Sequence, residues 1–283
     1  MILVFGATGT VGGEVARQLI ARGERPRLLV RDPAKAHAFD GSAEIMRGDF
    51  NDPQSLAAAL TGVEKAFLVT GTHGGVDPAL EFNAIDAAKA SGVAHLVKLS
   101  VVGVNAPIDT FARLHARCEA HLQESGISWT MVRPHYFMSN VRYWSETIRS
   151  QGAVYYPTAE GRWAAVDPAD IAAVAVAALT SPGHSGKTYS VSGPESLSAA
   201  QYVERLSAAI GKPIRFVNVP LEVVRDNLLK GGMPAVHADA LMDLLAAMKD
   251  GRLDFVDDGV HQATGRSAKS FDDWARCNAA AFR

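Results

Sequence analysis

The chain has 283 residues, of which 48% are hydrophobic and 20% are charged, and its formal net charge is −2. These values predict a folded protein with a full core, and they argue against disorder and against the basic surface that nucleic-acid binding requires. The two cysteines, Cys118 and Cys277, make no disulfide framework, and no apolar run approaches the ~20 residues of a membrane span. The first strand begins too early for a signal peptide. We therefore expect a cytoplasmic monomer or homodimer that binds neither nucleic acid nor membrane.

An apolar strand, a glycine-rich turn and a helix open the chain. Residues 2–5 are strand formers, and an amphipathic helix is predicted over 11–22. Three glycines stand at three-residue spacing: Gly6, Gly9 and Gly12. Glycine permits a sharp turn, and the free N–H groups of a helix N-terminus attract phosphate. This order is typical of a dinucleotide-binding unit, although the spacing is GxxGxxG and not GxGxxG.

The second predicted strand, residues 27–30, is followed by Arg31, and Lys35 comes one helical turn later. Arg31 stands near the ~20-residue distance at which this fold reads the ribose. An acid there suits the 2′-hydroxyl of NAD, whereas two cations suit the 2′-phosphate of NADP. Alternatively, both are solvated surface charges, and Asp32 places an acid nearby. We favour NADP(H) as the cofactor.

Strands and helices then alternate regularly. Strands are predicted over 43–47, 65–69, 95–100 and 128–132, and helices over 33–39, 53–60, 78–91 and 109–125. Continuous apolar strands of this kind fit a parallel sheet that is buried on both faces. The pattern predicts an α/β protein with a doubly wound Rossmann sheet, helices on both faces, and an NADP-binding core over residues 1–134.

The alternation breaks down after Pro134. An aromatic group follows that could form the wall for a flat aromatic substrate or could be ordinary core: Tyr136, Phe137, Tyr143, Trp144 and, further on, Trp163. Short strands are predicted over 154–156, 162–166, 187–192 and 214–219, and helices over 167–179, 198–210, 221–230, 236–248 and 271–281. We expect residues 135–283 to form a smaller α+β substrate-binding subdomain, with some segments returning to the Rossmann sheet.

The chain resembles the NmrA-like group of atypical short-chain dehydrogenases. Ordered matches carry the resemblance: GATGTVG (6–12), VRDPAK (30–35), GDF (48–50), AAKASGV (87–93), SGISWTMVRP (125–134), FMSN (137–140), DPADIA (167–172) and TYSVSGP (188–194). The resemblance implies an NADP-binding Rossmann domain with a small C-terminal domain. Some members of this group reduce quinones, triphenylmethane dyes or azo dyes, and others resemble redox sensors.

The resemblance also implies roles for single residues. Arg31 and Lys35 would hold the 2′-phosphate, Asp49 and Phe50 would face the adenine, and Ser100 and Pro134 would lie beside the nicotinamide. The pyrophosphate would be held by the turn residues Gly6, Thr8, Gly9, Thr10, Val11 and Gly12, and the middle of the cofactor would be lined by Val69, Thr70 and Gly71. Alternatively, Asp49 is only a turn or capping acid. The loop 72–76 is a candidate lid, and we expect its His73 to face the substrate.

The Tyr-x-x-x-Lys pair of typical short-chain dehydrogenases is missing. The corresponding stretch begins with Phe111 and ends with His115. Because imidazole titrates near neutrality, His115 is the candidate proton donor; alternatively it only packs beside the ligand. His115, Cys118 and His121 span too wide an arc of one helix to hold a metal. We expect an NADPH-dependent reductase that transfers hydride to a quinone-like or azo- or triphenylmethane-dye-like aromatic acceptor, or alternatively a non-catalytic NADP(H)-binding redox sensor.

Overall fold

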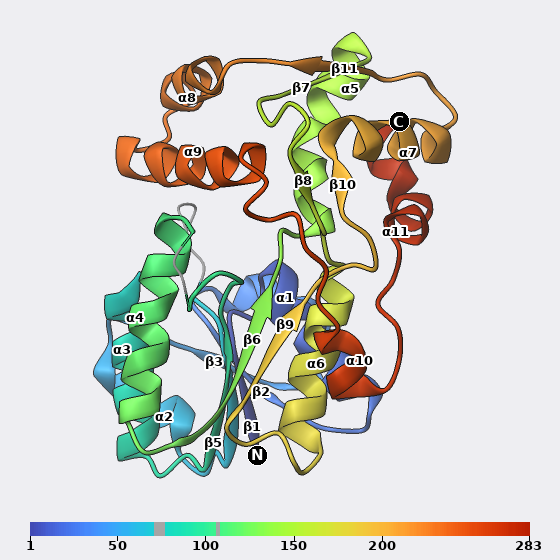
Figure 1. Ribbon diagram of the computed structural model, residues 1–283. Helices are drawn as coiled ribbons and strands as arrows, with labels where there is room; N and C mark the ends of the chain where they lie inside the picture. Colours follow the sequence, from blue (N-terminus) through green and yellow to red (C-terminus); the bar gives the residue numbers. More distant parts are fainter. Residues whose placement is uncertain (71–76, 106–107) are drawn as a thin grey trace.

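A sheet of seven parallel strands forms the centre of the computed structural model, which describes residues 1–70, 77–105 and 108–283 (Figure 1). Every neighbouring pair of strands in this sheet is parallel. The order across the sheet is β3 (Glu44–Arg47), β2 (Arg27–Val30), β1 (Ile2–Phe5), β4 (Lys65–Leu68), β5 (His95–Leu99), β6 (Ser128–Pro134) and β9 (Lys187–Val191). The reversal of order beside β1 is that of a doubly wound sheet, so the predicted fold class is confirmed.

Helices cover both faces of the sheet, and each face has its own apolar core (Figure 1). Against one face pack α1 (Thr10–Ala21), α6 (Pro168–Thr180) and α10 (Gly259–Thr264), with the 3-10 helix η1 (Pro33–Phe39) at its edge. Against the other face pack α2 (Pro53–Leu60), α3 (Pro78–Ala90) and α4 (Thr110–Glu124). The three helices α2, α3 and α6 begin in the same way, with an aspartate cap followed by proline, which is why the sequence marks them clearly.

A second lobe lies beyond the carboxyl ends of the strands (Figure 1). Its core is aromatic, and Trp163, Tyr202 and Phe271 are its largest wholly buried side chains. It is built from η2 (Met138–Trp144), α5 (Ser145–Gln151), β7 (Ala153–Tyr156), β8 (Arg162–Trp163), β10 (Leu197–Ser198), α7 (Ala199–Ile210), β11 (Arg215–Asn218), α8 (Leu221–Lys230), α9 (Ala235–Lys249), α11 (Phe271–Asn278) and η3 (Ala279–Phe282). Strand β7 pairs with β11 in parallel, and β8 pairs with β10 antiparallel.

The chain after Pro134 serves both lobes. Residues 168–191 supply helix α6 on one face of the sheet and its edge strand β9, whereas η2 and α5 belong to the second lobe. The predicted strand over 162–166 shortens to β8, because residues 164–166 continue as a buried segment that bonds to Tyr136 and Met138. No helix in the described residues is long and apolar enough to cross a membrane.

Candidate functional site

The glycine turn between β1 and α1 has the geometry of a phosphate cradle. Gly6 adopts a φ of +63°, which favours glycine, and the N–H of Gly9 donates to the carbonyl of Gly6 at 2.9 Å. A Cβ on Gly12 would stand 2.3 Å from the Gly6 carbonyl oxygen, so helix and strand touch at this point. No side chain in the described chain caps α1, which leaves its first N–H groups free for an anion. The turn therefore fits a dinucleotide pyrophosphate.

Two cations follow β2, the strand that pairs with β1. Arg31 and Lys35 are exposed, and neither makes an ion pair or side-chain hydrogen bond with the described residues. The nearby acid does not compete for the ribose, because Asp32 caps η1 by accepting the Ala34 N–H at 3.1 Å. Because these two cations are exposed and the adjacent acid is occupied by the helix cap, the position fits a 2′-phosphate and not a 2′-hydroxyl.

The predicted adenine residues form a turn of their own. The carboxylate of Asp49 accepts the Asn51 N–H at 2.8 Å, and its own N–H donates to Ser55 Oγ at 3.1 Å. Asp49 thus acts as a turn acid in the structure, and its contacts fix the loop after β3. Phe50 is half-buried and stacks on Phe5, with ring centroids 5.3 Å apart.

The predicted middle of the cofactor site lies after β4. Val69 is half-buried, and its Cγ1 would stand 2.9 Å from a Cβ on Gly6, so it packs directly against the glycine turn. Gly71, His73 and the candidate lid 72–76 lie outside the described residues. Thr70 is buried and donates its hydroxyl to Glu81 Oε1 at 2.9 Å.

Ser100 and Pro134 lie where β5 and β6 end, side by side in the sheet. The Ser100 N–H donates to the Val132 carbonyl at 2.7 Å, and the Pro134 carbonyl accepts from Val102 at 3.1 Å. The Ser100 side chain is 1% exposed, and its hydroxyl has no hydrogen-bond partner among the described residues. A buried hydroxyl of this kind usually has a partner, so it is available to a ligand at the carboxyl edge of the sheet.

A buried polar cluster beneath this edge was missed by the sequence reasoning. Lys98 of β5 and Glu81 of α3 form an ion pair at 2.7 Å, and both side chains are completely buried. Lys98 Nζ also donates to His115 Nδ1 of α4 at 3.1 Å. The available signal was a lysine in an otherwise apolar strand, because a buried charge requires a partner.

The environment of His115 changes its predicted role. Burial and then the nearby Lys98 ammonium hold the pKa of His115 well below its ordinary value. The imidazole is therefore neutral at pH 7. This direction of the pKa argues against the predicted imidazolium proton donor, and the neutral ring has an N–H that can donate a hydrogen bond.

The predicted aromatic wall is divided by the structure. Tyr143 is 84% exposed, whereas its neighbour Trp144 is 6% exposed and packs edge-on against Tyr156 in the second core. Consecutive residues of η2 point in different directions, so these two cannot form one wall. Tyr136 and Phe137 are half-buried directly after β6, and they are the members of the group that lie near the carboxyl edge.

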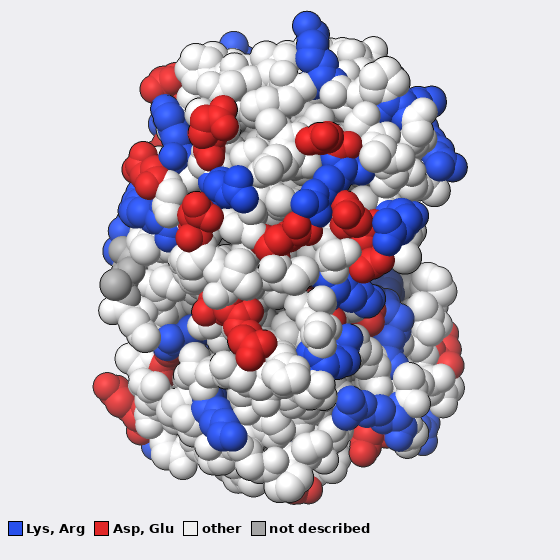
Figure 2. Space-filling view, turned by 45° about the vertical axis from the view of Figure 1, so that its right-hand side comes forward, with Lys and Arg blue, Asp and Glu red and all other residues white. Residues whose placement is uncertain are grey.

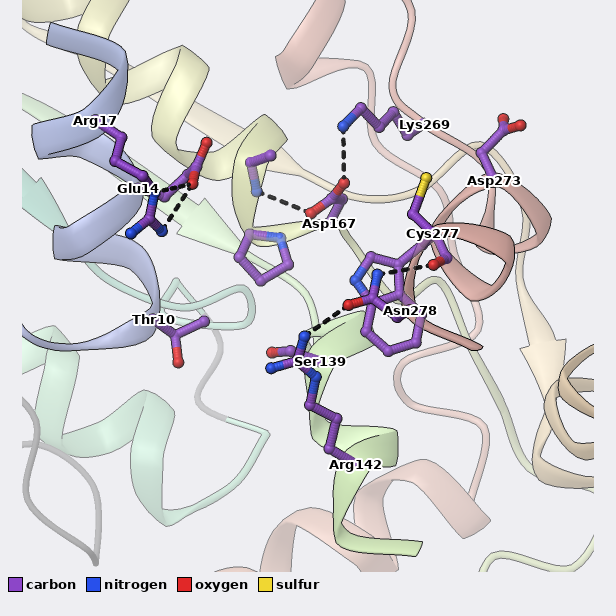
Figure 3. Close-up of a pocket in the computed structure, with 13 residues that line it drawn as sticks. Thr10, Glu14, Arg17, Ser139, Arg142, Asp167, Lys269, Asp273, Cys277 and Asn278 are labelled. Carbon is purple, nitrogen blue, oxygen red and sulfur yellow. Dashed lines mark hydrogen bonds and ion pairs between the residues drawn. The ribbon is translucent and has the colours of Figure 1, made fainter. Parts of the chain in front are cut away.

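A cavity of about 470 Å³ opens between the two lobes, on the α1 side of the sheet (Figure 3). Thr10 is the member of the predicted cofactor turn on its wall, and His115 is not among its lining residues. Figure 3 shows two ion pairs on its wall, Arg17 with Glu14 at 2.9 Å and Lys269 with Asp167 at 3.2 Å. The cavity thus adjoins the pyrophosphate turn and is not the predicted nicotinamide end.

Acidic and basic side chains are interspersed over the face of the molecule in Figure 2. That face carries no continuous basic stripe of the kind that tracks a nucleic-acid backbone.

Comparison with known proteins identifies the family. A family model described as NAD(P)H-binding matches residues 6–182. A protein of Xenophilus azovorans named NAD(P)H azoreductase is 41% identical over 100% of this chain and 99% of its own length. A protein of Streptomyces griseus named (4-alkanoyl-5-oxo-2,5-dihydrofuran-3-yl)methyl phosphate reductase is 40% identical over 100% and 99%. The crystal structure of the NADPH-dependent quinone oxidoreductase QOR2 from Escherichia coli in complex with NADPH superimposes with a TM-score of 0.87 at 26% identity, over 97% of this chain and 98% of the other. This chain belongs to the NAD(P)H-binding family, and its expected kinship with the NmrA-like short-chain dehydrogenases is confirmed.

Proposed function

We propose that this protein is an NADPH-dependent reductase that transfers hydride to a conjugated, electron-poor acceptor of the quinone, azo-dye or triphenylmethane-dye class. The observation that carries the proposal is the glycine turn before α1, which no described side chain caps, together with the exposed Arg31 and Lys35 after the neighbouring strand β2. The two relatives at 40% and 41% identity, both named as reductases and both matched along their whole length, support the same reaction type.

Each part of the site has a role in this proposal. The turn from Gly6 to Gly12 binds the pyrophosphate, the two cations bind the 2′-phosphate, and the loop of Asp49 and Phe50 receives the adenine. Ser100 and Pro134 flank the nicotinamide at the ends of β5 and β6. When bound there, NADPH supplies the hydride, while the protein orients the acceptor and excludes water. Residues 1–134 thus form the cofactor lobe, and segments of residues 135–283 cover the substrate.

The acceptor meets a neutral site. Tyr136 and Phe137 lie half-buried after β6 and supply aromatic surface to a flat ring. Neither a tyrosine nor a charged lysine takes the place of the missing Tyr-x-x-x-Lys pair on α4, where Phe111 and His115 stand. Acceptors whose reduced form is a stabilised anion need little help from an acid, and quinones and azo compounds are of this kind.

The test mixes the full-length protein with NADPH and a panel of acceptors, and follows the absorbance of the reduced nicotinamide. The panel contains a quinone, an azo dye, a triphenylmethane dye and an unsaturated lactone, with a simple ketone as the negative control. Saturable oxidation of NADPH by conjugated acceptors, and not by the ketone, is the expected result. Tight NADPH binding without turnover on any of them would favour the redox-sensor alternative. We also expect the protein to be cytoplasmic and to be a monomer or homodimer. Size-exclusion chromatography with light scattering measures the oligomeric state.

A further inference from the structure

The Lys98 ammonium is completely buried, and it forms one ion pair and two hydrogen bonds. Nζ lies 2.7 Å from Glu81 Oε2, 2.9 Å from the Leu99 carbonyl oxygen and 3.1 Å from His115 Nδ1. An ammonium group has three donors and no acceptor. Two of these donors bond to the Leu99 carbonyl and to His115 Nδ1, and the charge is balanced by the Glu81 carboxylate.

Four elements hold this group in place. Glu81 of α3 is itself anchored, because its second oxygen accepts the Thr70 hydroxyl at the end of β4 at 2.9 Å. Lys98 belongs to β5 and His115 to the second turn of α4. A buried ion pair adds little net stability compared with apolar residues of the same size. Stability alone thus does not account for a lysine at this position, whereas its hydrogen bond to His115 Nδ1 gives it a role at the site.

The direction of that hydrogen bond decides where the imidazole carries its own hydrogen. Lysine can only donate, so Nδ1 of His115 must be the lone-pair nitrogen, and the hydrogen must sit on Nε2. Among the groups around the ring, the Lys98 ammonium opposes a second proton on the imidazole. Lys98 faces it from β5, with Glu81 of α3 behind Lys98, and on α4 itself Cys118 is buried and uncharged. Asp243 of α9 is engaged by Thr110 and Arg113 instead.

We propose that Lys98 is a positioning residue, held by Glu81, which locks His115 as a neutral imidazole whose Nε2–H donates a hydrogen bond to the acceptor. The inference rests on the proposed function for the identity of the acceptor. A neutral quinone or azo acceptor gains the two electrons and the hydrogen of the hydride and becomes an anion. His115 stabilises this charge through Nε2–H without losing its proton, and a water molecule then protonates the product.

The first experiment reads the tautomer directly and needs no turnover. Imidazole nitrogen shifts are recorded by ¹⁵N NMR on the full-length protein from pH 5.5 to 8, and His115→Phe assigns the signal among the nine histidines. We expect His115 to stay neutral with its hydrogen on Nε2 throughout. A His115 that titrates within this range, or that carries its hydrogen on Nδ1, overturns the proposal.

Variants test whether Lys98 is the cause. Lys98→Met keeps the length of the side chain and removes the charge. If this variant does not fold, the double variant Lys98→Met/Glu81→Gln also removes the charge of the buried carboxylate that has lost its partner. In either protein we expect a mixture of the two tautomers and a rise in the pKa of His115, which stays below its ordinary value because the ring remains buried. An unchanged, fixed tautomer in the folded double variant refutes the role of Lys98. His121→Gln, on the same helix but paired with Asp86 at the surface, is the matched control.

The kinetic test separates donation of a hydrogen bond from donation of a proton. With an active acceptor, kcat of the native protein should be flat from pH 5.5 to 8, and His115→Phe should lower it by ~10–100-fold at every pH. A kcat that follows a group near pH 6.5, and loses this dependence in His115→Phe, would make His115 a proton donor and overturn the proposal. Absence of any active acceptor would contradict the proposed function alone, because the NMR result stands by itself.

Discussion

The closest backbone approach at the proposed site gives a sharp test of the phosphate cradle. In Gly12→Ala the new Cβ would stand 2.3 Å from the Gly6 carbonyl oxygen, 2.6 Å from the Gly6 carbonyl carbon and 2.9 Å from the Phe5 oxygen. All three are backbone atoms, so no flexible side chain can move aside. Ordinary contact requires a shift of α1 away from β1 by about 1 Å, in an interior that is close-packed.

The expected cost of Gly12→Ala follows from this overlap. Overpacking of a rigid site costs about 1–3 kcal/mol, and three backbone clashes place this site at the upper end. At roughly 2 °C per kcal/mol for a chain of this size, the melting temperature should fall by roughly 6 °C. The shift also moves the N–H groups that face the pyrophosphate. The native protein should gain about 2.7 kcal/mol from NADPH at 100 times Kd, and the variant should lose most of this gain.

Thermal unfolding by circular dichroism, with and without NADPH, measures both effects. Gly9→Ala is the matched control for stability, because its backbone φ is −92° and the nearest atom to a new Cβ is 3.2 Å away. It should cost only about 1 kcal/mol, as expected for an altered helix cap. If Gly12→Ala melts like the native protein and is stabilised equally by NADPH, the close contact of helix and strand does not form the cradle.

Three further predictions follow from single side chains. Arg31→Ala should weaken NADPH binding by roughly 10- to 100-fold through loss of a charge-assisted contact, and isothermal calorimetry should show little change for NADH; equal losses for both would contradict the 2′-phosphate assignment. Trp144→Ala should lower the free energy of unfolding by about 3–5 kcal/mol, whereas Tyr143→Ala should change it by less than about 0.5 kcal/mol in urea titrations; similar values would contradict their opposite orientations. Burial, with the Lys65 and His184 charges, lowers the pKa of His95 to about 4. As the pH falls, His95 therefore takes up a proton in the unfolded chain before it does so in the folded protein. The free energy of unfolding should fall by about 3 kcal/mol between pH 6.5 and pH 4. A His95→Gln variant whose free energy of unfolding has the same pH slope would refute this.

The Rossmann sheet was predictable because its signals are local. Apolar runs of four or five residues mark the strands, and aspartate-proline pairs such as those before α2 and α6 mark the helix starts. The glycine turn is equally local, since its conformation depends on residues 6–12. Even Arg31 and Lys35 could be placed, because a short strand fixes how far they lie beyond the sheet.

The second lobe was not predictable to the same extent, because its contacts are distant in the sequence. Strand β7 pairs with β11, about sixty residues later, and no local pattern fixes that register. In η2, composition alone could not show that Trp144 points inward and Tyr143 outward, since both are large aromatic residues that can be buried. The phase of a 3-10 helix depends on how its ends are packed.

The buried cluster of Lys98 explains why the two ends of the site differed so much in their predictability. The proposed phosphate end consists of backbone N–H groups and exposed cations, which a sequence motif can indicate. The other end depends on a charge on β5, its partner on α3 and a histidine on α4, and each of these residues is unremarkable by itself. They form a site only because the fold brings Glu81 Oε2 and His115 Nδ1 within 3.1 Å of Lys98 Nζ. An enzyme that lacks the Tyr-x-x-x-Lys pair can thus still polarise an acceptor, with a fixed neutral imidazole in place of an acidic phenol. Such a site selects acceptors that are reactive enough to take hydride before they take a proton.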